Sequence, residues 1–139
     1  MFTSAASSPH KNLERLVRAF VKITAHESFS NVKLVMVGEY KRETFHSYYG
    51  TIKALIGKLG VAEKVVLPGY LSDEKLVNLL NFSSVCVLPS LIEGFGLPAV
   101  EAAACGCPVI ATKESRCRRY LRMAEFTSRP RAKKNWKKR

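Results

Sequence analysis

Residues 93–101 read E-G-F-G-L-P-A-V-E and stand between two runs of different character. The run before them, 85–90, is V-C-V-L-P-S and predicts a buried strand; the run after them, 102–106, is A-A-A-C-G and predicts a helix that stops at a glycine. A glycine-rich turn between a strand and a helix is how an α/β protein builds an anion site, because the first N–H groups of the helix have no intrahelical partners. Pro98 fits the first helical turn, where its missing N–H costs nothing.

The rest of the chain alternates between short apolar runs and helical spacing. Expected strands cover residues 32–37, 64–68, 84–88 and 108–112, and expected helices cover 11–27, 43–59, 72–82 and 97–105. Short, nearly all-apolar strands separated by helices indicate a parallel sheet covered on both faces, so we expect a four-stranded Rossmann-like α/β domain. Ligands bind at the carboxyl ends of such strands, and Gly38, Gly69 and Glu93 all follow strand ends. These three loops are expected to converge on one crevice.

Composition supports a single globular domain, because the chain has 139 residues of which 47% are hydrophobic. The net charge of +12 is unevenly spread: residues 116–139 hold 11 Lys and Arg and one acid, whereas residues 1–115 hold 12 and 10. No apolar run reaches the roughly 18 residues of a membrane span. The four cysteines form no C-x-x-C pair and are interpreted as small buried hydrophobes in a reducing compartment, which predicts a cytoplasmic location.

The 93–101 motif, followed by A-A-A-C-G-C-P-V-I-A-T at 102–112, resembles the two-glutamate motif of group 1 (family 4) glycosyltransferases. Those enzymes are retaining, use nucleotide-diphosphate sugars and have two Rossmann-like domains, the GT-B arrangement. The resemblance covers residues 9–115 and matches the C-terminal, donor-binding half of such an enzyme. It implies that this chain binds a nucleotide-diphosphate sugar.

The resemblance implies roles for three charged residues. Lys11 binds the diphosphate, Glu101 accepts hydrogen bonds from the ribose hydroxyls, and Glu93 is the catalytic carboxylate that faces the donor sugar. The alternatives are an exposed lysine in the first turn of a helix and an acid near a helix N-terminus; a cation at that position opposes the helix dipole, which favours the binding role for Lys11. His10 stands where the family often has Arg, and both a phosphate contact and a solvated side chain stay open.

The resemblance also assigns donor contacts to the backbone of four turn residues, which are Gly94, Phe95, Gly96 and Leu97. Gly69 and Tyr70 belong to the loop that holds the base, mostly through its main chain; Tyr70 either stacks on the base or belongs to the edge of the core. No D-x-D motif is present, and the three histidines are dispersed. We therefore expect neither a metal site nor a cofactor beyond the donor itself.

Two departures from the family pattern affect the domain boundaries. The strand that normally precedes the helix of Lys11 has no clear counterpart, so residues 1–8 are interpreted as a disordered or partial leader and 9–115 as the donor domain. Residues 116–139 form a basic tail. Reading its codons one base out of phase permits V-P-E-I-L-K-N-G-G-I-Y-I, which resembles the family's continuation and indicates a frameshift. A basic nucleic-acid arm and a solvated terminus are the alternatives.

The function expected from these observations is that of a glycosyltransferase fragment, inactive alone, that binds a nucleotide-diphosphate sugar for retaining transfer. The alternative is a non-catalytic nucleotide-sugar-binding or regulatory module. A separate acceptor-binding domain is the expected partner, with peripheral membrane association through the missing half. No specific nucleic acid is expected, because the core lacks an aromatic and basic surface motif.

Overall fold

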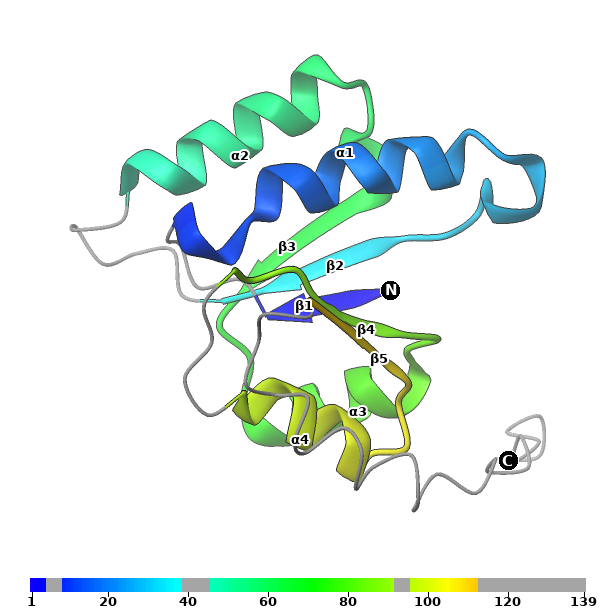
Figure 1. Ribbon diagram of the computed structural model, residues 1–139, viewed down its shortest axis with the longest axis vertical. Helices are drawn as coiled ribbons and strands as arrows, with labels where there is room; N and C mark the ends of the chain where they lie inside the picture. The colour runs from blue at the N-terminus through cyan, green and yellow to red at the C-terminus, as the bar shows by residue number, and fades with distance from the viewer. Residues whose placement is uncertain (5–8, 39–45, 92–95, 113–139) are drawn as a thin grey trace.

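The computed structural model describes residues 1–4, 9–38, 46–91 and 96–112 (Figure 1). Five parallel strands form one sheet in the order β3-β2-β1-β4-β5. The strands are β1 (Phe2–Ser4), β2 (Leu34–Val37), β3 (Val65–Gly69), β4 (Cys86–Leu88) and β5 (Val109–Ala111). The helices are α1 (Leu13–Thr24), α2 (His46–Lys58), α3 (Asp73–Phe82) and α4 (Leu97–Ala104), with 3-10 turns η1 (Pro9–Lys11), η2 (Glu27–Phe29) and η4 (Ala62–Lys64).

The helices cover both faces of the sheet, which confirms the Rossmann-like α/β fold. Helices α1 and α2 lie on one face, and α3 and α4 lie on the other (Figure 1). Each face has its own core cluster. The first is built mainly from α1, β2 and α2, with Val17 and Phe20 fully buried; the second joins Phe2 and Leu80 to β4 and α4. Burial on both faces explains the apolar runs of the inner strands β2 and β4, whereas the edge strands β3 and β5 leave Val66 and Ile110 exposed.

The expectation of four strands, with none before Lys11, is wrong. Phe2–Ser4 form β1, the central strand, which pairs with β2 through Phe2 and Val35 and with β4 through Phe2 and Cys86. Phe2 and Thr3 are 2% and 0% exposed. A three-residue strand with two hydroxyl side chains carries too little apolar pattern to be found from sequence. It is stabilised by the neighbours on both of its sides.

The other elements follow the predicted order with shorter ends. Helix α1 starts at Leu13 because residues 9–11 form a 3-10 turn and Asn12 adopts a left-handed conformation, with φ 54°. Ser72 occupies the predicted N-cap of α3, but its side chain makes no capping hydrogen bond. The expected start of the second helix at residue 43, the boundary at residue 8 and the whole basic tail lie outside the described residues.

The interpretation of the cysteines as small buried side chains is confirmed for two of them. Cys86 and Cys107 are 0% and 3% exposed, and both are free thiols. Burial, together with the nearby Cys107 and Glu101, raises the pKa of Cys86 to about 12, which keeps that thiol protonated and unreactive at neutral pH. Cys105 is only partly buried, and Cys117 lies outside the described residues.

Candidate functional site

The carboxyl ends of the strands meet at one edge of the sheet, and the chain reverses direction across the sheet at β1. Strand β2 lies on one side of β1 and β4 lies on the other. In an open parallel sheet, ligands bind in the crevice outside the carboxyl ends at such a reversal. The candidate site is therefore defined by the segments that leave β1 and β4. Lys11 follows β1, and Pro89–Leu91 follow β4.

Hydrogen bonds running in both directions join these two segments. The side-chain Nδ2 of Asn12 donates to the carbonyl of Pro89 at 3.2 Å. The N–H of Leu91 donates to the carbonyl of His10 at 2.9 Å. Lys11 stands between His10 and Asn12 in the sequence and is partly buried. The structure thus fixes the turn of Lys11 against the segment that leads into the glycine-rich motif.

The end of β5 supports the same segment from the other side. The Oγ1 of Thr112 donates to the carbonyl of Ser90 at 2.5 Å, and its N–H donates to the carbonyl of Leu88 at 3.3 Å. Ser90 is 2% exposed. The exit of β4 is consequently fixed to the exits of both neighbouring strands.

Helix α4 begins at the same edge, directly after the glycine turn. Its N-cap is Gly96, which is buried and has a left-handed backbone, φ 67°. Pro98 lies in the first turn, as predicted, and the carbonyl of Gly96 accepts from the N–H groups of Ala99 and Val100 at 2.9 and 3.4 Å. The amides of Gly96 and Leu97 precede these bonds, at the positive end of the helix dipole. This end of α4 suits a negatively charged group.

Glu101 lies on the exposed side of α4, in its second turn. Leu97 and Val100, on the same side, are 60% and 42% exposed, whereas Ala99 and Ala102 are buried against the sheet. The carboxylate is close enough to Cys86 to contribute to the raised pKa of that thiol. Because its side chain is exposed, Glu101 is accessible to a ligand on the surface of α4.

The predicted base-binding loop leaves β3 at the same edge of the sheet. Gly69 has a left-handed backbone, φ 80°, and its carbonyl accepts from the N–H of Gly38 at 3.1 Å. Strand β3 is two strand spacings from β1, about 10 Å. Tyr70 is 75% exposed, so the alternative that it belongs to the edge of the core is wrong. Its ring is accessible at the carboxyl edge.

Three predicted site residues, Glu93, Gly94 and Phe95, lie outside the described residues. Of the others, the structure places Lys11, Gly96, Leu97 and Glu101 on the segments that leave β1 and β4, and it places Gly69 and Tyr70 at the end of β3 on the same edge. Sequence reasoning missed Asn12 and Thr112 as residues that connect these segments. The signal available for Asn12 was its residue type, since Asn is one of the few L-residues that adopt a left-handed conformation readily.

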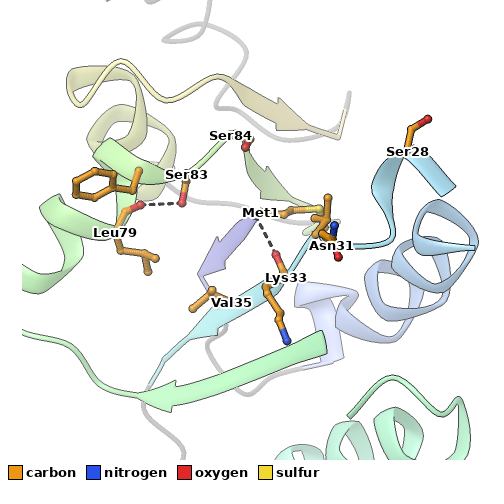
Figure 2. Close-up of a pocket in the computed structure, with 10 residues that line it drawn as sticks. Met1, Ser28, Asn31, Lys33, Val35, Leu79, Ser83 and Ser84 are labelled. Carbon is orange, nitrogen blue, oxygen red and sulfur yellow. Dashed lines mark hydrogen bonds between the residues drawn. The ribbon is translucent and has the colours of Figure 1, made fainter. Parts of the chain in front are cut away.

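Two hollows lie beside the sheet among the described residues. A hollow of about 370 Å³ lies at the amino ends of the strands, where the amino group of Met1 donates to the carbonyl of Lys33 at 3.0 Å and the Oγ of Ser83 donates to that of Leu79 at 2.8 Å (Figure 2). It contains no predicted site residue. The second hollow, about 440 Å³, lies between α1 and the β4–β5 pair, and Asn12 and Thr112 line it.

Within the described part of the chain, no three His, Cys, Asp or Glu side chains gather in a way that could hold a metal ion. No helix in the same residues is long and apolar enough to cross a membrane.

Comparison with known proteins gives consistent results. The family model for glycosyl transferases, group 1, matches residues 1–138. The MMP alpha-(1->4)-mannosyltransferase of Mycolicibacterium hassiacum is 34% identical over 110 residues, which cover 79% of this chain and 25% of that protein. The sucrose-phosphate synthase structure from Thermosynechococcus elongatus superimposes with a TM-score of 0.71 at 29% identity, over 84% of this chain and 28% of that one.

The Anabaena protein HepE, solved in complex with UDP, shares the fold with a TM-score of 0.71 at 24% identity, over 85% of this chain and 31% of that chain. This chain spans about a quarter of the length of the curated relatives that it matches.

Proposed function

Because the chain belongs to the group 1 glycosyl transferases, we propose that it is the donor-binding part of a retaining enzyme that transfers sugar from a nucleotide-diphosphate donor. The observation that carries this proposal is the junction between the exits of β1 and β4. Two hydrogen bonds there hold the turn of Lys11 against the segment that leads into the glycine turn and helix α4. A cation and a helix N-terminus then lie at one edge of the sheet.

This pair of features fits the chemistry of the leaving group. Breaking the bond between sugar and diphosphate places extra negative charge on the diphosphate, and groups already oriented toward that position stabilise it. The ammonium of Lys11 supplies a full positive charge, and the start of α4 supplies the partial positive charge of its dipole. In this proposal the protein neutralises the leaving group with its own residues and requires no metal ion.

The remaining parts of the donor fit the rest of the edge. Glu101 is exposed on α4, and a carboxylate can accept hydrogen bonds from two ribose hydroxyls at once. Tyr70 and the backbone of Gly69 lie at the end of β3, about 10 Å from β1, which is within reach of the base of the same nucleotide. HepE, which shares the fold, was solved in complex with UDP, and this supports a nucleotide as the ligand.

In the proposed mechanism Glu93 faces the donor sugar and stabilises the positive charge that develops on its ring. The acceptor hydroxyl must also be held at the anomeric carbon in a cleft that excludes water. We propose that a second, acceptor-binding domain supplies that half of the cleft. The 139-residue chain then binds the donor but does not transfer sugar by itself.

Calorimetric titration of the 139-residue chain with UDP, GDP and ADP tests the donor site. We expect one of them to bind and Lys11→Ala to weaken that binding by about 1.5–3 kcal/mol, the range for a hydrogen bond to a charged group. Lys33→Ala is the matched control, because Lys33 is an exposed lysine that precedes β2 at the opposite end of the sheet. Absence of binding by all three nucleotides, or equal effects of the two substitutions, would contradict the proposal.

A further inference from the structure

The exit of β4 is held from two sides by groups that the donor chemistry does not require. On one side, the Nδ2 of Asn12 donates to the carbonyl of Pro89 at 3.2 Å, next to the bond from Leu91 N–H to the carbonyl of His10 at 2.9 Å. On the other side, the Oγ1 of Thr112 donates to the carbonyl of Ser90 at 2.5 Å. Three consecutive residues after β4 are therefore fixed by residues that directly precede α1 and by the residue that directly follows β5.

The backbone of Asn12 is as specific as its side chain. Among the described residues other than glycine, Asn12 alone has a positive φ, which is 54°. It separates the 3-10 turn of Lys11 from the first turn of α1. Most L-residues are strained in this region, whereas Asn tolerates it. Its amide also spans to a segment 77 residues away in the sequence. One residue thus sets both the direction in which the chain leaves Lys11 and the contact with the exit of β4.

We propose that Asn12 is a positioning residue that, with Thr112, sets the spacing between Lys11 and the exit of β4, and thereby the affinity for the diphosphate of the donor. The inference rests on the proposed function of Lys11. A diphosphate must contact groups from both strand exits at once, so it binds best when their separation is fixed before it arrives. A nucleoside without phosphates lacks these contacts and does not depend on the spacing.

The substitution Asn12→Gly tests the side chain separately from the backbone, because glycine adopts the left-handed conformation readily and lacks the side chain that carries the amide. We expect it to weaken nucleoside-diphosphate binding by about three- to tenfold, the range for one net hydrogen bond, and to leave binding of the matching nucleoside unchanged. The probe is whichever of UDP, GDP and ADP the wild-type chain binds. Thr112→Val should act in the same direction, and Thr112→Ser, which keeps the hydroxyl, should retain the wild-type affinity.

Amide hydrogen exchange gives a readout that needs no ligand. In Asn12→Gly the N–H of Leu91 should exchange faster, because its partner, the carbonyl of His10, is no longer held in place. The N–H of Gly38, which is bonded to the carbonyl of Gly69 at 3.1 Å between β2 and β3, is the matched control and should keep its protection.

Each outcome separates this inference from the proposed function. If the wild-type chain binds no nucleoside diphosphate, the proposed function fails, and exchange at Leu91 still decides whether Asn12 fixes the two segments. If the wild type binds but Asn12→Gly binds the diphosphate equally well, the positioning role is overturned. An equal loss of nucleoside and diphosphate affinity would overturn it as well, because it would indicate a general loss of structure.

Discussion

The two ends of the parallel sheet differ in the hydrogen bonds and the helix ends that they contain. A hollow of about 370 Å³ lies at the amino end, and one of about 440 Å³ lies between α1 and the β4–β5 pair and reaches the carboxyl end at Asn12 and Thr112. At the amino end the hydrogen bonds are made by residues that line the hollow; one example is the bond from the amino group of Met1 to the carbonyl of Lys33 (Figure 2). At the carboxyl end they join loops from three strands, and the helix α4 begins there.

The direction of the chain explains this difference. In a unit of strand, helix and strand, each helix starts near the carboxyl end of the preceding strand and finishes near the amino end of the next. Helix N-termini, which attract anions, therefore gather at the carboxyl end, and helix C-termini gather at the other. The size of a hollow consequently says little about where an anionic ligand binds in this fold.

The largest expected effect concerns sugar transfer. The 139-residue chain should show no transfer from a nucleotide sugar to any acceptor, because in the proposed function its carboxyl end supplies only the donor contacts and a second domain holds the acceptor. A coupled assay for nucleoside-diphosphate release, with and without acceptor sugars, measures this. Saturable transfer by this chain alone would show that its carboxyl end forms a complete active site.

The next largest effect is expected on stability, at the central strand β1, which runs between the two ends of the sheet. Phe2→Ala should destabilise the chain by about 3–5 kcal/mol, because it removes a buried ring between the α3–α4 layer and the sheet. Urea unfolding followed by circular dichroism measures the loss. A cost below about 1 kcal/mol would mean that β1 is not a stable part of the sheet.

At the carboxyl end, Glu101→Ala should weaken binding of the nucleoside and of the nucleoside diphosphate alike, by about 1.5–3 kcal/mol, since its expected partner is the ribose. This pattern differs from that of Lys11→Ala, which should affect only phosphorylated ligands. Titration with both ligands distinguishes them. Glu74→Ala, at an exposed acid in the first turn of α3, is the control; a loss confined to the diphosphate would contradict the ribose assignment.

The smallest effect is expected at the amino-end hollow. Phe82 lines it and is 81% exposed, so Phe82→Ser should change the free energy of unfolding by no more than about 0.5 kcal/mol and leave nucleotide affinity unchanged. The same urea and calorimetry experiments measure both quantities. A clear loss of nucleotide affinity in this variant would show that the amino end takes part in binding.

The sequence by itself determined the parallel α/β fold and the likeness of residues 93–112 to a donor-binding motif. Periodicity was sufficient for this, because the strands of a sheet with helices on both faces are short apolar runs and the helices carry one apolar stripe. Helices α3 and α4 and strands β2 to β5 therefore lie within a few residues of their predicted bounds. Gly96 and Pro98 likewise indicated the start of α4 through local backbone chemistry.

Only the tertiary structure decided β1 and the contacts of Asn12 and Thr112. Phe2–Ser4 form a strand because β2 and β4 supply hydrogen-bonding partners on both sides, and a three-residue segment contains no pattern that reports such neighbours. The bond from Asn12 to Pro89 joins residues 77 positions apart. Local propensity describes a residue and its sequence neighbours, whereas these features depend on which segments the folded sheet brings together.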